Sequence, residues 1–200
     1  MKPMADPARK TDRHYTYADY VTWPDDERWE LIDGVAYNMS ASPLRNHQKI
    51  LGDLYVKVRA ALKPGGCETY LAPFDVFILS ETDDEADKTD TIVEPDLVVV
   101  CDPSKLVHRG CAGAPDWVVE ILSTWTMQKD ITVKLELYER AGVREYWVID
   151  PGNEAVMVYL LDDGGRYPPD PALHHRGDIV FGIVVPTLTV DLDELFGRDT

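Results

Sequence analysis

The segment 115–123, PDWVVEILS, decides the fold class of this 200-residue chain. Residues 117–122 form a short apolar run that contains Glu120, and residues 97–101 form a second apolar run. Pro-Asp precedes each of them. Short apolar runs of this kind are typical of strands that other elements cover on both faces of a sheet. Both segments therefore predict core strands of an α/β domain.

Two helices are predicted beside these strands. Over residues 47–62, apolar residues recur every three or four positions, as in an amphipathic helix, and the Pro-Gly-Gly of residues 64–66 ends it. A second helix is predicted over residues 129–141, because one apolar stripe runs along it and Gly142 follows at its end. A further buried strand is expected over residues 146–149.

The remaining elements extend this core at both ends. Residues 29–37 predict a hairpin, because Asp33-Gly34 supplies the positive φ that a tight turn needs. We expect one α/β domain over residues 15–200, preceded by a flexible arm over residues 1–14. The other predicted elements are a short helix beginning in 15–20, a strand over 68–79 broken near Pro73, a solvated acidic loop over 81–90, a C-terminal hairpin or small sheet from 155–161 and 179–185, and a last helix over 192–196.

The charge of the chain limits its partners. Twenty Lys and Arg residues stand against 36 Asp and Glu residues, which gives a net charge of −16. A field of this sign repels polyanions, so any nucleic-acid site must be local. The one basic island is the predicted first helix with its flanks, from Arg45 to Lys63, where Asp53 is the single acid. It is either a surface for nucleic acid or an ordinary solvent-facing helix side.

Membrane and disulfide signals are weak. No apolar stretch is long enough to span a bilayer, and the first residues contain no secretory apolar segment, so we expect a cytoplasmic protein with no membrane partner. Cys67, Cys101 and Cys111 are odd in number and have no Cys-x-x-Cys spacing. We interpret them as reduced packing residues.

Two carboxylates in the predicted strands indicate a metal site. Asp96 opens one strand, and Glu120 shares one face of the next strand with Val118 and Leu122. A buried carboxylate must be paired, protonated or bound to a cation. Carboxylates that lie close together repel each other unless a divalent cation neutralises them, and oxygen ligands favour Mg²⁺ or Mn²⁺.

Lys134 is the predicted partner of these acids. On the second helix, Asp130, Lys134 and Tyr138 are four residues apart and share one face. A lysine beside a metal ion stabilises the charge that develops on a phosphate during phosphodiester hydrolysis. The common motifs of esterases, P-loop proteins, zincins and dinucleotide-binding proteins are absent from the sequence. The pattern therefore favours phosphodiester chemistry.

Each of these residues also has a purely structural interpretation. Glu120 can form a structural ion pair with Lys134 or Lys129, and Lys134 can lie on a solvent-facing stripe beside Asp130 and Glu139. Asp96 can be a polar residue at the start of a strand, and Tyr138 can be a core residue. Glu30 can be a solvated residue before the hairpin turn. His47 and Gln48 can be helix caps or exposed side chains.

Several linked motifs resemble one known family. They are residues 29–34 (WELIDG), 47–48 (HQ), 94–100 (EPDLVVV), 115–123 (PDWVVEILS) and 134–151 (KLELYERAGVREYWVIDP). As a set, they resemble the Uma-type putative restriction endonuclease family of the PD-(D/E)xK nuclease superfamily, over nearly the whole chain from about Tyr15 to Phe196.

The resemblance implies a restriction endonuclease-like core: a mixed central sheet flanked by helices, with an N-terminal hairpin and C-terminal β decoration. It implies that Asp96 and Glu120, with the main-chain carbonyl of Ile121, ligate Mg²⁺ or Mn²⁺, and that Glu30 completes the acidic site. The superfamily usually has its lysine two residues after the second acid, where this chain has Leu122. The resemblance therefore implies that Lys134 serves as the catalytic lysine.

The function that follows is a Mg²⁺-dependent endonuclease acting on DNA, in which Glu30 helps to hold or activate water. Gln48, Lys49 and Tyr138 are accessory or substrate-binding residues. The sheet edge, the C-terminal hairpin and the family resemblance favour a homodimer, which suits an enzyme that cuts two strands. Two alternatives stay open. One is a binding or assembly module that kept the fold while its site decayed, and the other is a metal-dependent phosphoesterase for RNA or a small substrate.

Overall fold

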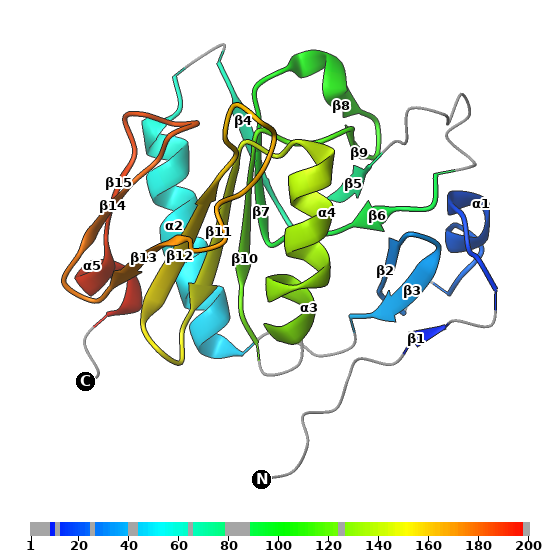
Figure 1. Cartoon of the computed structure of the whole chain (residues 1–200), viewed down its shortest axis with the longest axis horizontal. Helices are drawn as coiled ribbons and strands as arrows, with labels where there is room; N and C mark the ends of the chain where they lie inside the picture. The colour runs from blue at the N-terminus through cyan, green and yellow to red at the C-terminus, as the bar shows by residue number, and fades with distance from the viewer. Residues whose placement is uncertain are drawn as a thin grey trace, which may run out of the picture.

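A six-stranded sheet forms the centre of the molecule (Figure 1). The computed structural model describes residues 9–10, 13–24, 27–39, 44–63, 66–78, 89–123 and 127–197. From edge to edge, the central sheet consists of β13 (Ala172–His175), β12 (Ala155–Leu160), β11 (Glu145–Asp150), β10 (Trp117–Ile121), β7 (Leu97–Val100) and β4 (Glu68–Leu71). The strands β10 and β11 are parallel, and the other neighbours in this sheet are antiparallel. The mixed α/β fold class is confirmed.

Helices cover both faces of this sheet. Helix α2 (Arg45–Ala61) packs on one face, while α3 (Met127–Ile131) and α4 (Val133–Ala141) lie on the other (Figure 1). Successive residues of a strand point to opposite faces of the sheet. In β10, Val119 packs in the cluster that contains Leu54 of α2, and Val118 packs in the cluster that contains Leu137 of α4. The short apolar runs are therefore strands buried on both faces, as predicted.

A second sheet of seven strands packs beside α4 (Figure 1). Its order is β1 (Arg9–Lys10), β3 (Val35–Asn38), β2 (Trp29–Ile32), β6 (Ile92–Val93), β5 (Asp75–Phe77), β9 (Gly110–Ala112) and β8 (Leu106–Val107). The predicted hairpin is confirmed as β2 and β3, and its turn residues Asp33 and Gly34 have φ values of 50° and 72°. The expected arm over residues 1–14 includes β1, which pairs with β3.

The chain ends in a small layer next to α2. The strands β14 (Ile179–Phe181) and β15 (Thr189–Asp191) pair with each other, and α5 (Leu192–Phe196) follows directly. Two short helices complete the described elements: α1 (Tyr17–Tyr20) and the 3-10 helix Pro103–Lys105. No helix in the described part of the chain has the length and apolar character to cross a membrane.

The predicted interruption near Pro73 is confirmed, because β4 and β5 lie on either side of it and belong to different sheets. Two other expectations about elements were wrong. The helix over 129–141 is broken at Thr132 into α3 and α4. The C-terminal hairpin does not join 155–161 to 179–185, because β12 belongs to the central sheet and β14 pairs with β15. Most of the acidic segment 81–90 lies outside the described residues.

The interpretation of all three cysteines as reduced was also wrong. Cys67 and Cys101 form a disulfide, and Cys111 is a free, buried thiol. Glu68 pairs with Val100 in the antiparallel ladder of β4 and β7. Cys67, just before Glu68, therefore lies opposite Cys101, just after Val100. The strand register, which sequence spacing does not display, brings the two sulfur atoms together.

Candidate active site

Asp96 links three elements at one end of the central sheet. It precedes β7, and its Oδ2 atom accepts a hydrogen bond of 2.8 Å from the backbone N–H of Ile121. The same oxygen lies 3.1 Å from Nε2 of His47, in the first turn of α2. Asp96 reaches Ile121 because β7 and β10 are antiparallel, with Leu97 opposite Val119. With 20% of its side chain exposed, Asp96 is accessible from solvent.

Glu120 is buried beneath α4. Its Oε1 atom accepts hydrogen bonds of 2.7 Å from Nζ of Lys134 and 2.9 Å from the hydroxyl of Tyr138. Lys134 and Tyr138 are four residues apart, so one helix face presents both to the same carboxylate. The solvent-stripe interpretation of Lys134 is wrong, since only 2% of its side chain is exposed.

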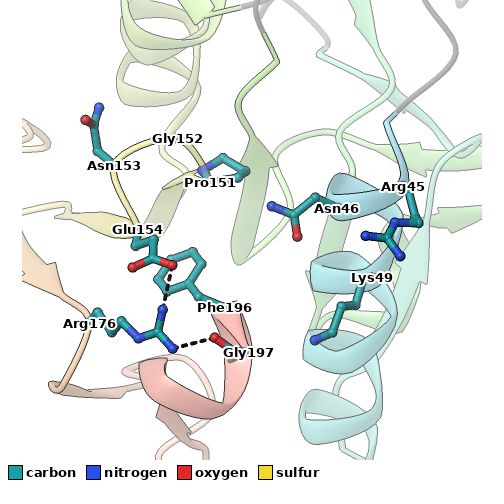
Figure 2. Close-up of a pocket in the computed structure, with 10 residues that line it drawn as sticks. All are labelled: Arg45, Asn46, Lys49, Pro151, Gly152, Asn153, Glu154, Arg176, Phe196 and Gly197. Atoms are coloured by element: carbon teal, nitrogen blue, oxygen red, sulfur yellow. Dashed lines mark hydrogen bonds and ion pairs between the residues drawn. The ribbon is translucent and has the colours of Figure 1, made fainter. Parts of the chain in front are cut away.

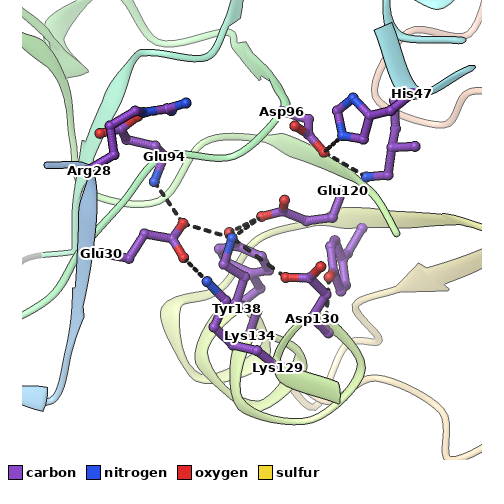
Figure 3. A network of polar contacts seen from close by, with 12 residues as sticks. Arg28, Glu30, His47, Glu94, Asp96, Glu120, Lys129, Asp130, Lys134 and Tyr138 are labelled. Carbon is purple, nitrogen blue, oxygen red and sulfur yellow. Dashed lines mark hydrogen bonds and ion pairs between the residues drawn. The ribbon is translucent and has the colours of Figure 1, made fainter. Parts of the chain in front are cut away.

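Glu30 brings the second sheet into contact with these residues (Figure 3). Its Oε1 atom lies 2.7 Å from Nζ of Lys134 and accepts a hydrogen bond of 3.0 Å from the backbone N–H of Glu94. Its other oxygen, Oε2, forms an ion pair with Lys129. Glu30 is completely buried, so its interpretation as a solvated residue is wrong.

These side chains form one group of neighbouring charges, which we call the acid cluster. Its last carboxylate, Asp130, has Oδ1 3.7 Å from Nζ of Lys134. The members of the acid cluster are Glu30, Asp96, Glu120, Asp130, Lys129 and Lys134 (Figure 3). Asp96 contacts His47 and the backbone of Ile121 and acts on Glu120 through its charge. With every group ionised, the cluster has four carboxylates and two ammonium groups, a formal excess of two negative charges.

Burial and charge act differently on its two glutamates. Burial raises the pKa of Glu30, but the charges of Lys129 and Lys134 outweigh burial and lower this pKa to about 2. Burial also raises the pKa of Glu120, and the nearby acids add to it, so that the opposing charge of Lys134 still leaves a pKa of about 8. Burial lowers the pKa of Lys134, yet the surrounding carboxylates raise it well above its usual value. Lys134 is thus an ammonium ion at neutral pH.

The charge and donor types fit a divalent cation. Protein contacts with described residues engage Oδ2 of Asp96 and Oε1 of Glu120, which leaves the second oxygen of each carboxylate for a ligand. Mg²⁺ is commonly held by one or two carboxylates, with water and substrate phosphate completing its coordination. Within the described ranges, no three His, Cys, Asp or Glu side chains converge as a ready-made metal site, so the protein's side-chain donors would be this pair alone.

The accessory candidates lie in different places. Tyr138 is buried and contacts Glu120. Gln48 and Lys49 are exposed on α2, Lys49 pairs with Asp53 at 2.6 Å, and no described contact joins either side chain to the acid cluster. The structure therefore brings Tyr138 to the predicted acids and leaves Gln48 and Lys49 apart from them.

Sequence reasoning named His47 and Lys129 but gave them the wrong surroundings. His47 is neither a cap nor exposed, because it is buried beside Asp96, and Lys129 pairs with Glu30 rather than with Glu120. His47 is three residues before Ile50 and four before Leu51, so the apolar period of the helix already placed it on the buried side. No period in the sequence indicated that the partner of Lys129 is Glu30. Lys129 is five residues before Lys134, and the two amines reach one carboxylate although the helix is broken between them.

The same fold occurs in a solved structure described as a nuclease. The chain is similar to the crystal structure of a putative nuclease belonging to DUF820 from Anabaena variabilis ATCC 29413, with a TM-score of 0.71 and 20% sequence identity. The similarity covers 91% of this chain and 97% of that chain. Within this fold class, the chain belongs to the Uma2 family, described as putative restriction endonuclease, which matches residues 17–193. No curated protein matches the chain. The family resemblance seen in the motifs is confirmed.

Proposed function

We propose that this protein is a metal-dependent nuclease that hydrolyses phosphodiester bonds in DNA. Membership in the Uma2 family and the shared fold support a nuclease. The observation that carries the proposal is the position of Lys134, whose ammonium group is held among Glu30, Glu120 and Asp130 at the strand end where Asp96 lies. A buried lysine beside carboxylates that retain open oxygens matches what hydrolysis of a charged phosphodiester requires.

Asp96 and Glu120, with the main-chain carbonyl of Ile121, would hold Mg²⁺ or Mn²⁺. When bound, such an ion neutralises the excess negative charge and lowers the pKa of water that attacks phosphorus. The backbone N–H of Ile121 and the ring of His47 fix the orientation of Asp96. The hydroxyl of Tyr138 does the same for Glu120.

Lys134 is the proposed catalytic lysine. Its ammonium group donates hydrogen bonds and, close to the scissile phosphate, stabilises the negative charge that develops there. Glu30 and Lys129 are positioning residues in this scheme. Both oxygens of Glu30 are occupied, by Lys129 on one side and by Lys134 with the Glu94 N–H on the other, so Glu30 fixes the lysine rather than a water molecule.

Cleavage of supercoiled plasmid DNA with Mg²⁺ or Mn²⁺ tests the proposal. We expect Asp96→Asn and Glu120→Gln to lower the rate by about 10²-fold or more, in the range found when a group that stabilises transition-state charge is removed. Glu136→Gln is the matched control, because Glu136 is exposed on the same helix as Lys134. Equal rates for Asp96→Asn and the wild type would contradict the proposal. RNA and bis(p-nitrophenyl) phosphate, as parallel substrates, identify the substrate class.

A binding module without catalysis is the second candidate. The direct ion pair between Lys134 and Glu120 favours it, because this pair alone accounts for the burial of both groups. Calorimetric titration with Mn²⁺ separates the two functions. Binding to the wild type that is lost in Glu120→Gln supports the nuclease, and no binding to the wild type supports the module.

A homodimer and a cytoplasmic location belong to the same proposal. The edge strands β4 and β13 of the central sheet are the surfaces on which a second copy would add. Light scattering at micromolar concentration tests the homodimer separately. A monomeric mass would contradict the homodimer without affecting the nuclease assignment.

A further inference from the structure

A pocket of about 930 Å³ lies between the first turns of α2, the turn after β11 and the end of α5 (Figure 2). One wall is the first turns of α2, with Arg45 and Asn46 immediately before His47, the partner of Asp96. The wall opposite begins at Pro151, just after β11. Because Ile149 of β11 pairs with Ile121 of β10, the pocket starts where the strand of Glu120 ends.

The lining of this pocket is basic in a strongly acidic chain. Arg45, Lys49 and Arg176 line it, against one acid, Glu154, although the whole chain has a net charge of −16. Arg45 and Lys49 are four residues apart on α2 and therefore neighbours. No acidic side chain lies in the first turn of this helix to offset them.

The basic side chains of the two walls differ in how far acidic partners neutralise them. Nη1 of Arg176 lies 2.7 Å from Oε1 of Glu154 (Figure 2). Its Nε lies 3.1 Å from Oδ1 of Asp193, so the two acids balance the charge of Arg176. Arg176 thus shapes its wall without attracting a ligand strongly. Arg45, by contrast, has no hydrogen bond or ion pair with any described residue. On the α2 wall, Lys49 pairs with Asp53 at 2.6 Å, so the unbalanced positive charge of the pocket is that of Arg45.

We propose that this pocket binds a phosphate-bearing nucleotide of the substrate strand, beside the phosphodiester that is cleaved. The identity of the strand rests on the proposed function, and the phosphate chemistry rests on the pocket. Arg45 and Lys49 contact the phosphate, since arginine and lysine are the main phosphate ligands among side chains. The volume is at the upper end of the roughly 300–1,000 Å³ typical of ligand pockets, so it accommodates more than inorganic phosphate. Phe196 adds an aromatic ring to the lining.

Fluorescence anisotropy with a labelled oligonucleotide in EDTA tests this pocket without requiring cleavage. We expect Arg45→Ala/Lys49→Ala to weaken binding by about tenfold or more at low salt, and to reduce the slope of log affinity against log salt by about 1.4–1.8, the value for two lost phosphate contacts. Lys57→Ala/Arg59→Ala is the matched control, since it removes the same charge from the same helix away from the pocket. Its affinity loss should be several-fold smaller.

Three outcomes would overturn the proposal. They are equal losses in the two double variants, no measurable binding by the wild type, and displacement of the oligonucleotide by low millimolar inorganic phosphate, which would make the pocket a free-phosphate site. Failure of the nuclease function has a different signature. In that case oligonucleotide binding depends on Arg45 and Lys49, while plasmid DNA stays intact with Mg²⁺ or Mn²⁺.

Discussion

The Nζ atom of Lys134, on α4, lies 2.7 Å from the Oε1 atom of Glu30, on β2. This ion pair joins the helix that covers the central sheet to a strand of the second sheet. Both groups are almost completely buried, at 2% and 0% side-chain exposure, so neither charge is solvated by bulk water. Their interaction is therefore far stronger than that of a surface ion pair. Lys129 also keeps Glu30 ionised, and Glu120 and Asp130 also keep Lys134 ionised.

Removal of Lys134 should destabilise the protein. In Lys134→Met, three carboxylates lose their shared cation, and breaking a buried pair costs about 3–5 kcal/mol. Urea unfolding at pH 7 measures this loss. Lys57→Met serves as the control, because Lys57 forms an ion pair with Glu194 near the surface and should contribute about 1 kcal/mol or less. A Lys134→Met protein as stable as the wild type would show that the acid cluster is not held by this amine.

Glu30 should make the protein sensitive to acid. Its pKa of about 2 in the folded protein is below the ordinary value of 4.5, so its contribution to stability is complete above pH 4.5 and disappears as the pH falls through 2. The difference between these two pKa values corresponds to about 3 kcal/mol of unfolding free energy. The midpoint of urea unfolding, determined at several pH values between 2 and 5, measures this loss of stability. In Glu30→Gln the decline over this range should be shallower, whereas exposed Glu136→Gln should follow the wild type.

Metal affinity should rise with pH. The pKa of Glu120 is raised to about 8, so below pH 8 a cation must displace a proton to bind its carboxylate. We expect Mg²⁺ affinity to increase about tenfold per pH unit between pH 6 and 8 and to level off above, the slope for release of one proton. Calorimetry at several pH values measures this. An affinity that is constant over the range would contradict the raised pKa.

Thiol counting should find one reactive cysteine per denatured, unreduced chain. Cys67 and Cys101 are joined, and burial raises the pKa of the remaining thiol, Cys111, to about 11. Cys111 should therefore react slowly with iodoacetamide until the protein unfolds. After reduction, three thiols should titrate, and the folded protein should lose about 3–4 kcal/mol of stability for a loop with a sequence separation of 34. Three thiols without reduction would contradict the disulfide.

Local sequence signals were sufficient for several parts of the fold. The Asp33-Gly34 turn adopts the positive φ values that these two residues favour, and this fixed the hairpin that carries Glu30. The alternation of a strand placed Glu120 on the face of Val118, which is the face that α4 covers. Helical spacing then brought Lys134 and Tyr138 to the same carboxylate.

Contacts between segments that are distant in the chain could not be predicted from local sequence patterns. The partner of Lys129 is Glu30, from another sheet, and no period in the sequence relates the two. The Cys67–Cys101 disulfide depends on the register of β4 against β7. The pocket lies between the start of α2, the turn after β11 and the end of α5, so it exists only after three remote segments have packed.

The position of Glu30 on the second sheet has a consequence for biosynthesis. Glu30 and Glu120 come from different sheets, so the ion pairs of Glu30 with Lys129 and Lys134 form only once both sheets have docked. A chain that has formed only one of them exposes lysines and carboxylates to water, where they are poorly oriented. Newly made chains should therefore complete the acid cluster late, together with their final packing.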